Sequence, residues 1–480
     1  MSRTMRSFIL ILAITLVGFG WTAAGRAQSA ADIAVKAAQK YSGTTLRVIW
    51  EAGLQAQDPL TFSGPEWKRL TGITLQVVET PFPEIFSKIV TAHLGGSRDF
   101  DVINYVPAWQ ADLVAAGALE PLDPFLDKYM PRGSLDDIHP TYRQWLNWKG
   151  KTYGIFDDGD VFVMYYRRDL FAEPANRAAF RAKYGQDLVP PRTWADWDKV
   201  CGFFTEKYKP NLYGCAIQRT EGQDYFWTEE AMRNNGVRFF DPQTMKAQIN
   251  SPPAVRTLTE MVNANKSMPP GVEKWGFIEV FSAWMAGKVA MIVTWPPPGR
   301  WSEGYGNRVE QLKWLPETKV IGKVGYALPP GGHPELAAAF NLGVSVESAN
   351  KEAAYLFIQW ATSKETSLKR VMLPFALRDP YRLSHYASKE YRALWPHAPE
   401  YLDTLKSGAE KGLLDLAIPG AREYEEALDR ATVAVYAGTP PKEALDKAAT
   451  EWDQVTQRIG VDKQRQAYQE WASKPNAYPH

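Results

Sequence analysis

Short β-rich runs alternate with amphipathic helical patterns from residue 44 onward, and this alternation restricts the possible folds more than any other feature of the chain. The first runs are LRVIW, ITLQVVE and FDVINYV, with helical patterns around Pro65–Leu70 and Pro83–His93 between them. Strands separated by helices favour βαβ units and a mostly parallel sheet. Such sheets bind ligands beyond the carboxyl ends of their strands. The sequence therefore predicts an α/β fold with its site near the ends of these runs.

Residues 1–30 show the pattern of a secretory signal peptide. Two arginines precede an apolar stretch that begins at Phe8, and small residues follow through Ala31. The apolar stretch is too short to span a bilayer comfortably, and the small residues fit cleavage between positions 27 and 31. A lipid-anchored protein would need a cysteine there, but the only cysteines are Cys201 and Cys215. We therefore expect an exported, periplasmic protein whose signal peptide is removed and which carries no lipid anchor.

The composition argues against nucleic acid as a partner. The 55 basic and 54 acidic residues are interspersed and give a formal charge of +1, so no strong field is available to attract a polyanion. No later segment is apolar enough to embed the chain in a membrane. The 18 Trp and 22 Tyr residues offer flat apolar faces with polar edges, which suit the stacking of sugar rings and polyol chains. Most of them are nevertheless expected to be ordinary core residues.

Cys201 and Cys215 are expected to form a structural disulfide. They lie fourteen positions apart, and pairing is the default for two cysteines in an exported protein. A loop of this size stabilises a fold by roughly 3 kcal/mol in the chain-entropy account. A catalytic thiol would need a partner histidine, which the sequence does not identify.

An acidic cluster stands in the middle of the segment GKTYGIFDDGDVFVMYYRRDLF, residues 150–171. Asp157, Asp158 and Asp160 surround Gly159 between a short apolar run and a β-rich strand. Carboxylates at the mouth of a strand can accept hydrogen bonds from several hydroxyl groups, and charged acceptors make the stronger bonds. The cluster therefore suits a sugar or polyol, although such residues also occur in ordinary solvated turns.

Two later strands end where the chain is expected to pass between lobes. Val289–Thr294 is an apolar run that stops at Trp295 and three prolines. The run VGYALPP, which begins at Val324, is followed by two glycines and then by FNLGVSV. Together with residues 150–171, these would make three passages. From Asn350 onward the apolar spacing is mainly helical.

Four segments in the right order resemble the extracellular solute-binding proteins of bacterial ABC importers, in the class that binds sugars, oligosaccharides and polyols. They are GKTYGIFDDGDVFVMYYRRDLF, FSAWMAGKVAMIVTWP, FNLGVSVESANKEAAYLFIQWATSKE and TPPKEALDKAATEW. The resemblance covers nearly the whole mature chain. The sequence departs from the family at Arg167-Arg168, where Asn-Lys is usual, and at Phe156, where proline is common.

The resemblance implies a two-lobed α/β periplasmic binding protein fold with three inter-lobe crossovers, class II-like, and a ligand cleft between the lobes. The first lobe is expected at 40–155 plus 293–337, and the second at 156–292 plus 338–480 with a helical C-terminal extension. Such a protein closes by hinge motion around its ligand. It would act as a monomer without catalytic residues, cofactor or metal, and would deliver a carbohydrate or polyol to the membrane permease subunits of an ABC importer.

Ten residues are candidates for ligand binding. In the resemblance an acidic residue six positions before the tyrosine of YRRDLF faces the cleft, and a tryptophan often ends the crossover strand. The others lie at strand ends, in the acidic cluster, in the second lobe or after Leu373-Pro374. The set is Asp160, Trp295, Asp157, Asp158, Glu51, Trp50, Tyr105, Trp109, Trp227 and Arg378.

Two alternatives stay open. A secreted carbohydrate-active enzyme would need two carboxylates across a scissile bond, and the cluster supplies acids, but no catalytic signature is present. A binding protein for a non-sugar ligand, such as a phosphorylated solute, is kept open by the tandem Arg167-Arg168. A calcium loop does not fit, because the alternating ligands and the distal glutamate are missing.

Overall fold

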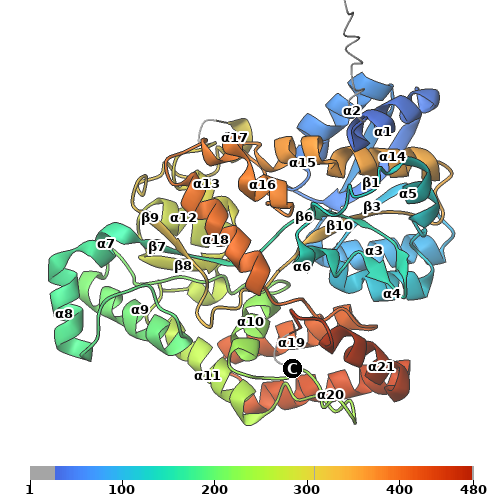
Figure 1. Ribbon diagram of the computed structural model, residues 1–480. Coiled ribbons are helices and arrows are strands. Elements are labelled where there is room, and N and C mark those ends of the chain that lie inside the picture. Colours follow the sequence, from blue (N-terminus) through green and yellow to red (C-terminus); the bar gives the residue numbers. More distant parts are fainter. Residues whose placement is uncertain (1–27, 307–308, 478–480) are drawn as a thin grey trace, which may run out of the picture.

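The computed structural model describes residues 28–306 and 309–477 and consists of two α/β lobes and a helical group that contacts both (Figure 1). Most of the predicted signal peptide, residues 1–27, lies outside the described residues. The first described helix, α1, is Ala30–Ala38. Among the described residues, no helix has the length and apolar character that a membrane crossing would need.

The first lobe is built on a five-stranded sheet in the order β2-β1-β3-β10-β6. β1 is parallel to β2 and β3, as the alternation predicts, whereas β10 is antiparallel to β3 and β6. The strands are β1 Thr45–Glu51, β2 Thr74–Thr80, β3 Val102–Tyr105, β6 Ile155–Asp158 and β10 Phe340–Val344.

Helices cover both faces of this sheet (Figure 1). α1 and α14 (Lys351–Thr362) lie on one face and α3 (Phe82–Leu94) on the other. Side chains alternate along β1, so Leu46, Val48 and Trp50 enter the core beneath α14, while Ile49 belongs to the opposite core. The remaining elements of this lobe are α2 Gly64–Thr71, α4 Gln110–Ala116, α5 Asp123–Tyr129, α6 Pro140–Arg143, β4 Asn147–Trp148, β5 Lys151–Thr152 and α15 Lys364–Val371.

The second lobe contains a three-stranded antiparallel sheet in the order β8-β7-β9. Its strands are β7 Val163–Arg167, β8 Met291–Thr294 and β9 Val324–Ala327. The helices around it are α7 Arg168–Ala172, α8 Pro174–Tyr184, α9 Trp194–Tyr208, α12 Phe277–Met285, α13 Pro297–Trp301, α16 Leu383–Ala387, α17 Lys389–Arg392 and α18 Ala398–Lys411. The predicted disulfide is confirmed: Cys201 in α9 is bonded to Cys215, with their α-carbons 5.2 Å apart.

A helical group lies below both lobes in Figure 1. It comprises α10 Tyr225–Asn234, α11 Pro252–Asn265, α19 Ala421–Tyr436, α20 Pro441–Ile459 and α21 Val461–Ala472. It reaches the first lobe through α19, where the Glu425 carboxylate accepts a 3.1 Å hydrogen bond from the Trp109 indole. The predicted helical C-terminal extension is therefore present and contacts both lobes.

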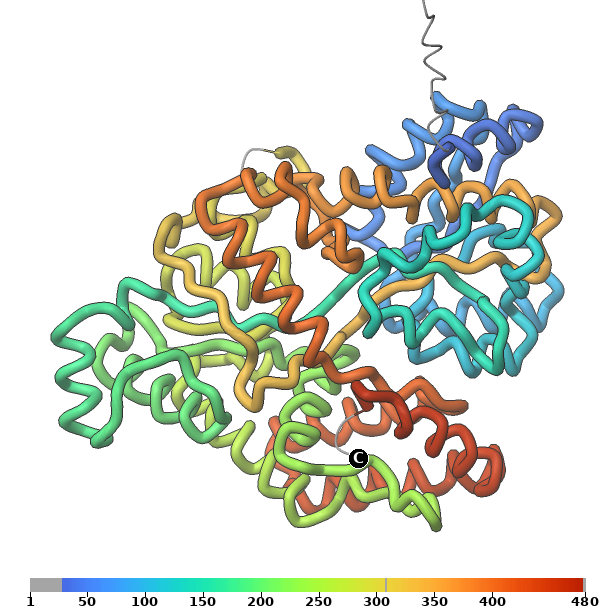
Figure 2. The backbone as a smooth tube through the Cα atoms, in the orientation of Figure 1, coloured from blue at the N-terminus to red at the C-terminus, as the bar shows by residue number. Residues whose placement is uncertain are grey.

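Three segments join the two lobes. Figure 2 shows the first two as teal and yellow-orange tubes. They are residues 159–162 from β6 to β7, residues 328–339 from β9 to β10, and residues 372–382 from α15 to α16.

The strand pairing overturns part of the predicted lobe boundaries. β9, within the 293–337 assigned to the first lobe, pairs with β7 in the second. β10, within the 338–480 assigned to the second lobe, pairs with β3 in the first. The passage predicted at Trp295 is also wrong, because the chain enters α13 of the same lobe. β8, β9 and β10 are short apolar runs, and such a run does not reveal which sheet it joins.

Candidate ligand-binding cleft

A cavity of about 350 Å³ lies between the two lobes, at the joining segments. Two carboxylates and two amides supply its polar groups, and the other lining side chains are aromatic or aliphatic. None of the described residues that line it is basic. The lining is Glu51, Ala52, Leu54, Gln55 and Phe340 from the first lobe; Gln223, Phe277, Ile278, Trp295, Pro297 and Trp314 from the second; and Asp160, Ala338 and Leu377 from the joining segments.

Aromatic rings form a fixed wall on the second lobe. The Trp295 ring meets Trp227 edge-on with 5.0 Å between ring centroids, and its indole N–H donates a 3.0 Å hydrogen bond to the Ala337 carbonyl. Phe277 lies 6.2 Å from the rings of both Trp295 and Trp314. Trp314 is 37% exposed, whereas Trp295 is 6% exposed. The wall thus combines a locked indole with one whose face is available to a ligand.

Two arginines hold Asp157 behind the cavity. The Arg378 Nε donates a 2.8 Å hydrogen bond to Asp157, and Arg370 binds both Asp157 and Asp58. Burial raises the pKa of the Asp157 carboxyl, but the two guanidinium groups outweigh burial and hold it below its usual range. Asp157 is therefore an ionised structural residue.

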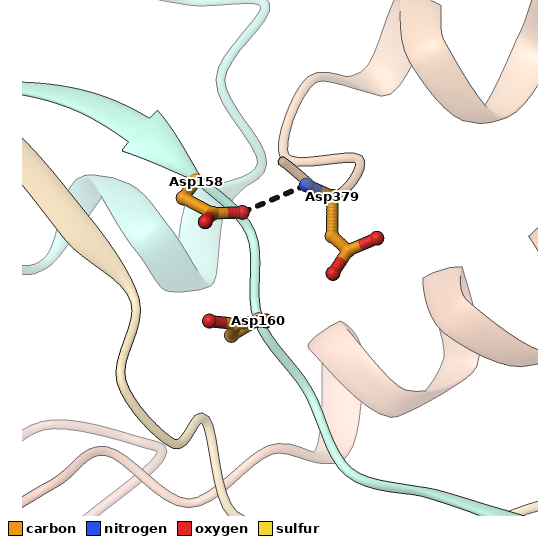
Figure 3. A group of neighbouring side chains, drawn as sticks. All are labelled: Asp158, Asp160 and Asp379. Atoms are coloured by element: carbon orange, nitrogen blue, oxygen red, sulfur yellow. Dashed lines mark hydrogen bonds between the residues drawn. The ribbon is translucent and has the colours of Figure 1, made fainter. Parts of the chain in front are cut away.

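Asp158, Asp160 and Asp379 form a different kind of group at the cavity floor (Figure 3). One carboxylate oxygen from each lies within 4.8 Å of the other two, and all three side chains are buried. Asp158 accepts a 2.7 Å hydrogen bond from the backbone N–H of Asp379, and Asp379 lies 3.3 Å from a guanidinium nitrogen of Arg300.

The carboxyl groups of this floor are hard to ionise. Burial and then the charge of Asp158 raise the pKa of Asp379 to about 8, and burial with Asp157 raises that of Asp158 to about 6. The pKa of Asp160 is raised well above its usual range by burial and then by Asp158 and Asp379. Burial also raises the pKa of Glu51, at the end of β1, to about 7. Burial and mutual repulsion therefore disfavour the ionisation of all these carboxyl groups at once.

The family becomes clear from comparison with known proteins. Residues 43–367 match the model of the family described as bacterial extracellular solute-binding protein. The chain belongs to this family.

Individual relatives are distant. A probable amino-acid ABC transporter periplasmic-binding protein of Sinorhizobium fredii is 23% identical over 380 residues, 78% of this chain and 81% of that protein. An erythritol/L-threitol-binding protein of Mycolicibacterium smegmatis is 23% identical, over 77% of this chain and 76% of that one. The fold resembles the crystal structure of an ABC transporter solute-binding protein from Agrobacterium radiobacter K84 in complex with ribitol, with a TM-score of 0.71, 24% identity, and coverage of 86% and 99%. The predicted two-lobed binding-protein fold is confirmed.

In this solute-binding protein, three of the ten predicted residues line the cavity: Glu51, Asp160 and Trp295. Each lies where the sequence indicates, at the end of a strand or just after one. The structure does not bring the other seven to the lining.

Four of those seven are aromatic residues with internal partners. Trp50 lies under Arg378, 4.9 Å from its guanidinium carbon, because alternation along β1 turns it away from the face of Glu51. The Tyr105 hydroxyl donates to Gln110, and the Trp227 indole donates to the Val293 carbonyl behind Trp295. Trp109, as described above, binds Glu425. The polar atoms of Tyr105, Trp109 and Trp227 are thus occupied within the protein, and the Trp50 ring is covered by Arg378.

The remaining three, Asp157, Asp158 and Arg378, form an ionic network that links Asp157 to the floor residue Asp158. Arg378 bridges the two aspartates, so its positive charge is directed at them. Asp158 also accepts a 3.4 Å hydrogen bond from Gln55, which does line the cavity. These residues influence the lining without forming it.

Sequence reasoning missed most of the lining, including Gln55, Gln223, Phe277, Trp314 and Phe340. Trp314 could have been suspected, because it is an aromatic residue in a mainly polar stretch. Phe277 begins the apolar helix α12 and Phe340 begins the apolar strand β10, so neither differs in sequence from a core residue.

A metal ion would have little free charge to bind here. Of the three floor carboxylates, Asp158 is held by Arg378 and a backbone N–H, and Asp379 is paired with Arg300. The floor is better described as carboxyl groups that share protons.

Proposed function

We propose that this protein captures a single sugar or polyol molecule in the inter-lobe cleft and delivers it unchanged to the permease subunits of an ABC importer. The observation that carries the proposal is the cavity between two lobes, where carboxyl and amide groups face aromatic rings. The protein is exported to the periplasm, acts as a monomer and carries no lipid anchor.

The lining supplies what a polyhydroxylated ligand needs. Asp160, Glu51, Gln55 and Gln223 offer acceptors and donors for hydroxyl groups, and Trp295, Phe277 and Trp314 offer faces for C–H surfaces. A ligand without hydroxyl groups would leave these buried polar groups unpaired, which disfavours its binding. The volume lies at the low end for small-molecule pockets, which span about 300–1,000 Å³. A monosaccharide or linear polyol therefore fits better than an oligosaccharide.

Electrostatics disfavours an anionic solute. None of the described lining residues is basic, and two are acidic. The tandem arginines that kept a phosphorylated ligand in consideration have other partners: Arg167 pairs with Asp169, and Arg168 pairs with Glu400. One relative is named as an amino-acid binding protein. An amino acid in this cavity would find no basic side chain among the described lining residues to pair with its carboxylate.

Closure follows from the way the chain joins its lobes. Three short segments connect them, and all three contribute to the cavity through Asp160, Ala338 and Leu377. A ligand that contacts both lobes stabilises the closed arrangement only by binding it more tightly than the open one. Moving the mixture from 1:99 to 99:1 takes about 5.5 kcal/mol of differential affinity.

The test is a thermal-shift screen of the mature protein against polyols, monosaccharides, disaccharides, sugar phosphates and amino acids. A ligand at 100 times its dissociation constant adds about 2.7 kcal/mol to stability. We expect shifts with polyols or monosaccharides and none with sugar phosphates. The active compound is then incubated with the protein and recovered. Recovery of hydrolysis products would favour the enzyme alternative, and a shift only with phosphorylated compounds would overturn the proposal.

A further inference from the structure

The cleft carries more acidic character than a neutral sugar needs. Glu51 lines it from the first lobe and Asp160 from the first joining segment, and Asp158 and Asp379 stand behind Asp160. The described lining offers neither a basic side chain nor a hydroxyl group of its own. The solute is therefore surrounded mainly by acceptors. The indole N–H groups of Trp295 and Trp314 donate to backbone carbonyls, so the amide N–H groups of Gln55 and Gln223 are the main side-chain donors of the described lining.

We propose that the solute is an amine-bearing sugar or polyol whose ammonium group binds between Asp160 and Glu51. This inference rests on the proposed function and specifies the chemical class of its ligand. An ammonium group carries three N–H donors and no acceptor, so it is the complement of an acceptor-rich lining.

Gln55 supplies an independent reason for a hydrogen-bond donor at this position. It lines the cavity, and its side-chain carbonyl oxygen is buried and lacks a hydrogen-bond partner among the described residues, while its amide N–H donates to Asp158. Asp158 belongs to the floor group with Asp160 and Asp379 (Figure 3). A cation at Asp160 would compensate the negative charge that is otherwise neutralised by bound protons.

The neighbouring arginines have partners behind the cavity and do not line it. Arg378 is enclosed between Asp157 and Asp158, and Arg300 donates to the Tyr391 hydroxyl and to backbone carbonyls. The α12 N-terminus borders the cavity, but the Glu279 carboxylate accepts a 2.9 Å hydrogen bond from the N–H of its Gly276 cap. Positive charge near the cavity is thus taken up internally.

The aromatic wall favours the same ligand. Faces of Trp and Phe rings attract a cation within about 6 Å of the ring centroid. Phe277, Trp295 and the more exposed Trp314 supply such faces in a cavity that also contains two carboxyl groups. A neutral polyol would stack on these rings without the electrostatic part of the attraction.

The experiment compares sorbitol with 1-amino-1-deoxysorbitol, which differ only in one hydroxyl and one ammonium group. Calorimetric titration of the mature protein gives both dissociation constants, at low and at high salt. We expect the amine to bind about ten- to a hundredfold more tightly, the range for a hydrogen bond to a charged group. The preference should decrease in high salt, because ions screen the charge pair. Glucose and glucosamine serve as a second matched pair.

Two substitutions test whether the ammonium group binds at Asp160 and Glu51. Asp160→Asn and Glu51→Gln should each reduce the amine preference, measured as the ratio of the sorbitol to the amine dissociation constant, about tenfold or more. Asp403→Asn is the matched control, because Asp403 is an exposed carboxylate paired with Arg392 outside the cavity. It should retain the full preference.

The outcomes separate this inference from the proposed function. If neutral compounds bind as tightly as their amines, the inference is overturned and the sugar or polyol function stands. If the preference persists in both cavity variants, the ammonium position is wrong. If neither neutral nor amine compounds of the panel bind, both the inference and the proposed function are overturned.

Discussion

Asp157 and Asp160 are three residues apart and equally buried, yet their surroundings are opposite. Two guanidinium groups surround Asp157, whereas Asp160 faces the carboxyl groups of Asp158 and Asp379. The pKa of Asp157 is lowered and that of Asp160 is raised. Burial alone therefore does not decide the state of an acidic residue in this cleft. The internally paired carboxylate stabilises the fold, and the one without an arginine is available to a ligand.

Gly159 makes this division possible. A β-carbon at this position would lie 2.2 Å from the Pro380 carbonyl oxygen, so only glycine allows the first and third joining segments to approach this closely. The approach brings Asp379 against Asp158 and Asp160. The two kinds of carboxyl environment thus arise from one backbone contact at the hinge.

Removing Arg370, which binds Asp58 and Asp157, should have the largest effect on stability. Arg370→Leu leaves Asp58 and Asp157 buried with one guanidinium group fewer, and we expect a loss of about 3–5 kcal/mol in the free energy of unfolding at neutral pH. Urea denaturation measures it. Arg458→Leu is the control, because its ion pair with Glu423 is exposed, and should cost less than about 1 kcal/mol. Equal losses would contradict the structural role of the buried pair.

The same substitution at the two aspartates tests the comparison directly. Asp157→Asn removes an ionised partner from two arginines and should cost about 1.5–3 kcal/mol. Asp160→Asn replaces a carboxyl whose pKa is raised well above its usual range by a neutral group of the same shape, and should change stability by less than about 1 kcal/mol. Both are read from denaturation at pH 7. A larger loss of stability in Asp160→Asn than in Asp157→Asn would contradict the assignment of Asp157 as the structural residue and Asp160 as the ligand-binding one.

The pH dependence of stability should follow the ionisation of the carboxyl groups at the cavity floor. The pKa of Asp379 is raised to about 8 in the folded protein, above its unfolded value of about 3.9. Its contribution is therefore complete below about pH 4 and is lost as the pH rises toward 8. A proton held only in the folded state contributes a slope of up to about 1.4 kcal/mol per pH unit.

Asp379→Asn should make the curve of unfolding free energy against pH flatter between pH 5 and 8. Asp157 acts in the opposite direction, because its pKa is lowered in the folded state: its contribution is lost as the pH falls below about 4. Asp157→Asn should therefore keep the Asp379 part of the slope between pH 5 and 8, and should lower the pKa of Asp158 because the Asp157 charge is lost. An identical curve for Asp379→Asn and the unaltered protein would mean that Asp379 is ionised throughout.

Sequence patterns predicted the fold and three cavity residues because these depend on local order. Glu51, Asp160 and Trp295 follow or end recognisable strands, so their position near the strand ends could be inferred. The environment of Asp160 could not, because Asp379 reaches it from a distant segment through the contact at Gly159. Alternation along β1 excludes Trp50, but the sequence alone does not say which face of that strand meets the cleft.

The smallest effect on stability is expected at Trp314, which extends the comparison from carboxyl groups to aromatic rings. Trp295 is fixed by Trp227 and by its hydrogen bond to Ala337, so Trp295→Ala should cost about 3–5 kcal/mol and would confuse binding with folding. Trp314 is partly exposed, and its indole N–H donates only to the nearby Gln311 carbonyl. Trp314→Ala should therefore change stability by about 0.5 kcal/mol or less and weaken ligand affinity about tenfold, equivalent to about 1.4 kcal/mol. Trp148→Ala, in β4 and outside the cavity, is the matched control and should keep full affinity. Unchanged affinity in Trp314→Ala would remove the exposed half of the aromatic wall from the binding site and leave Trp295 and Phe277 as its stacking surface.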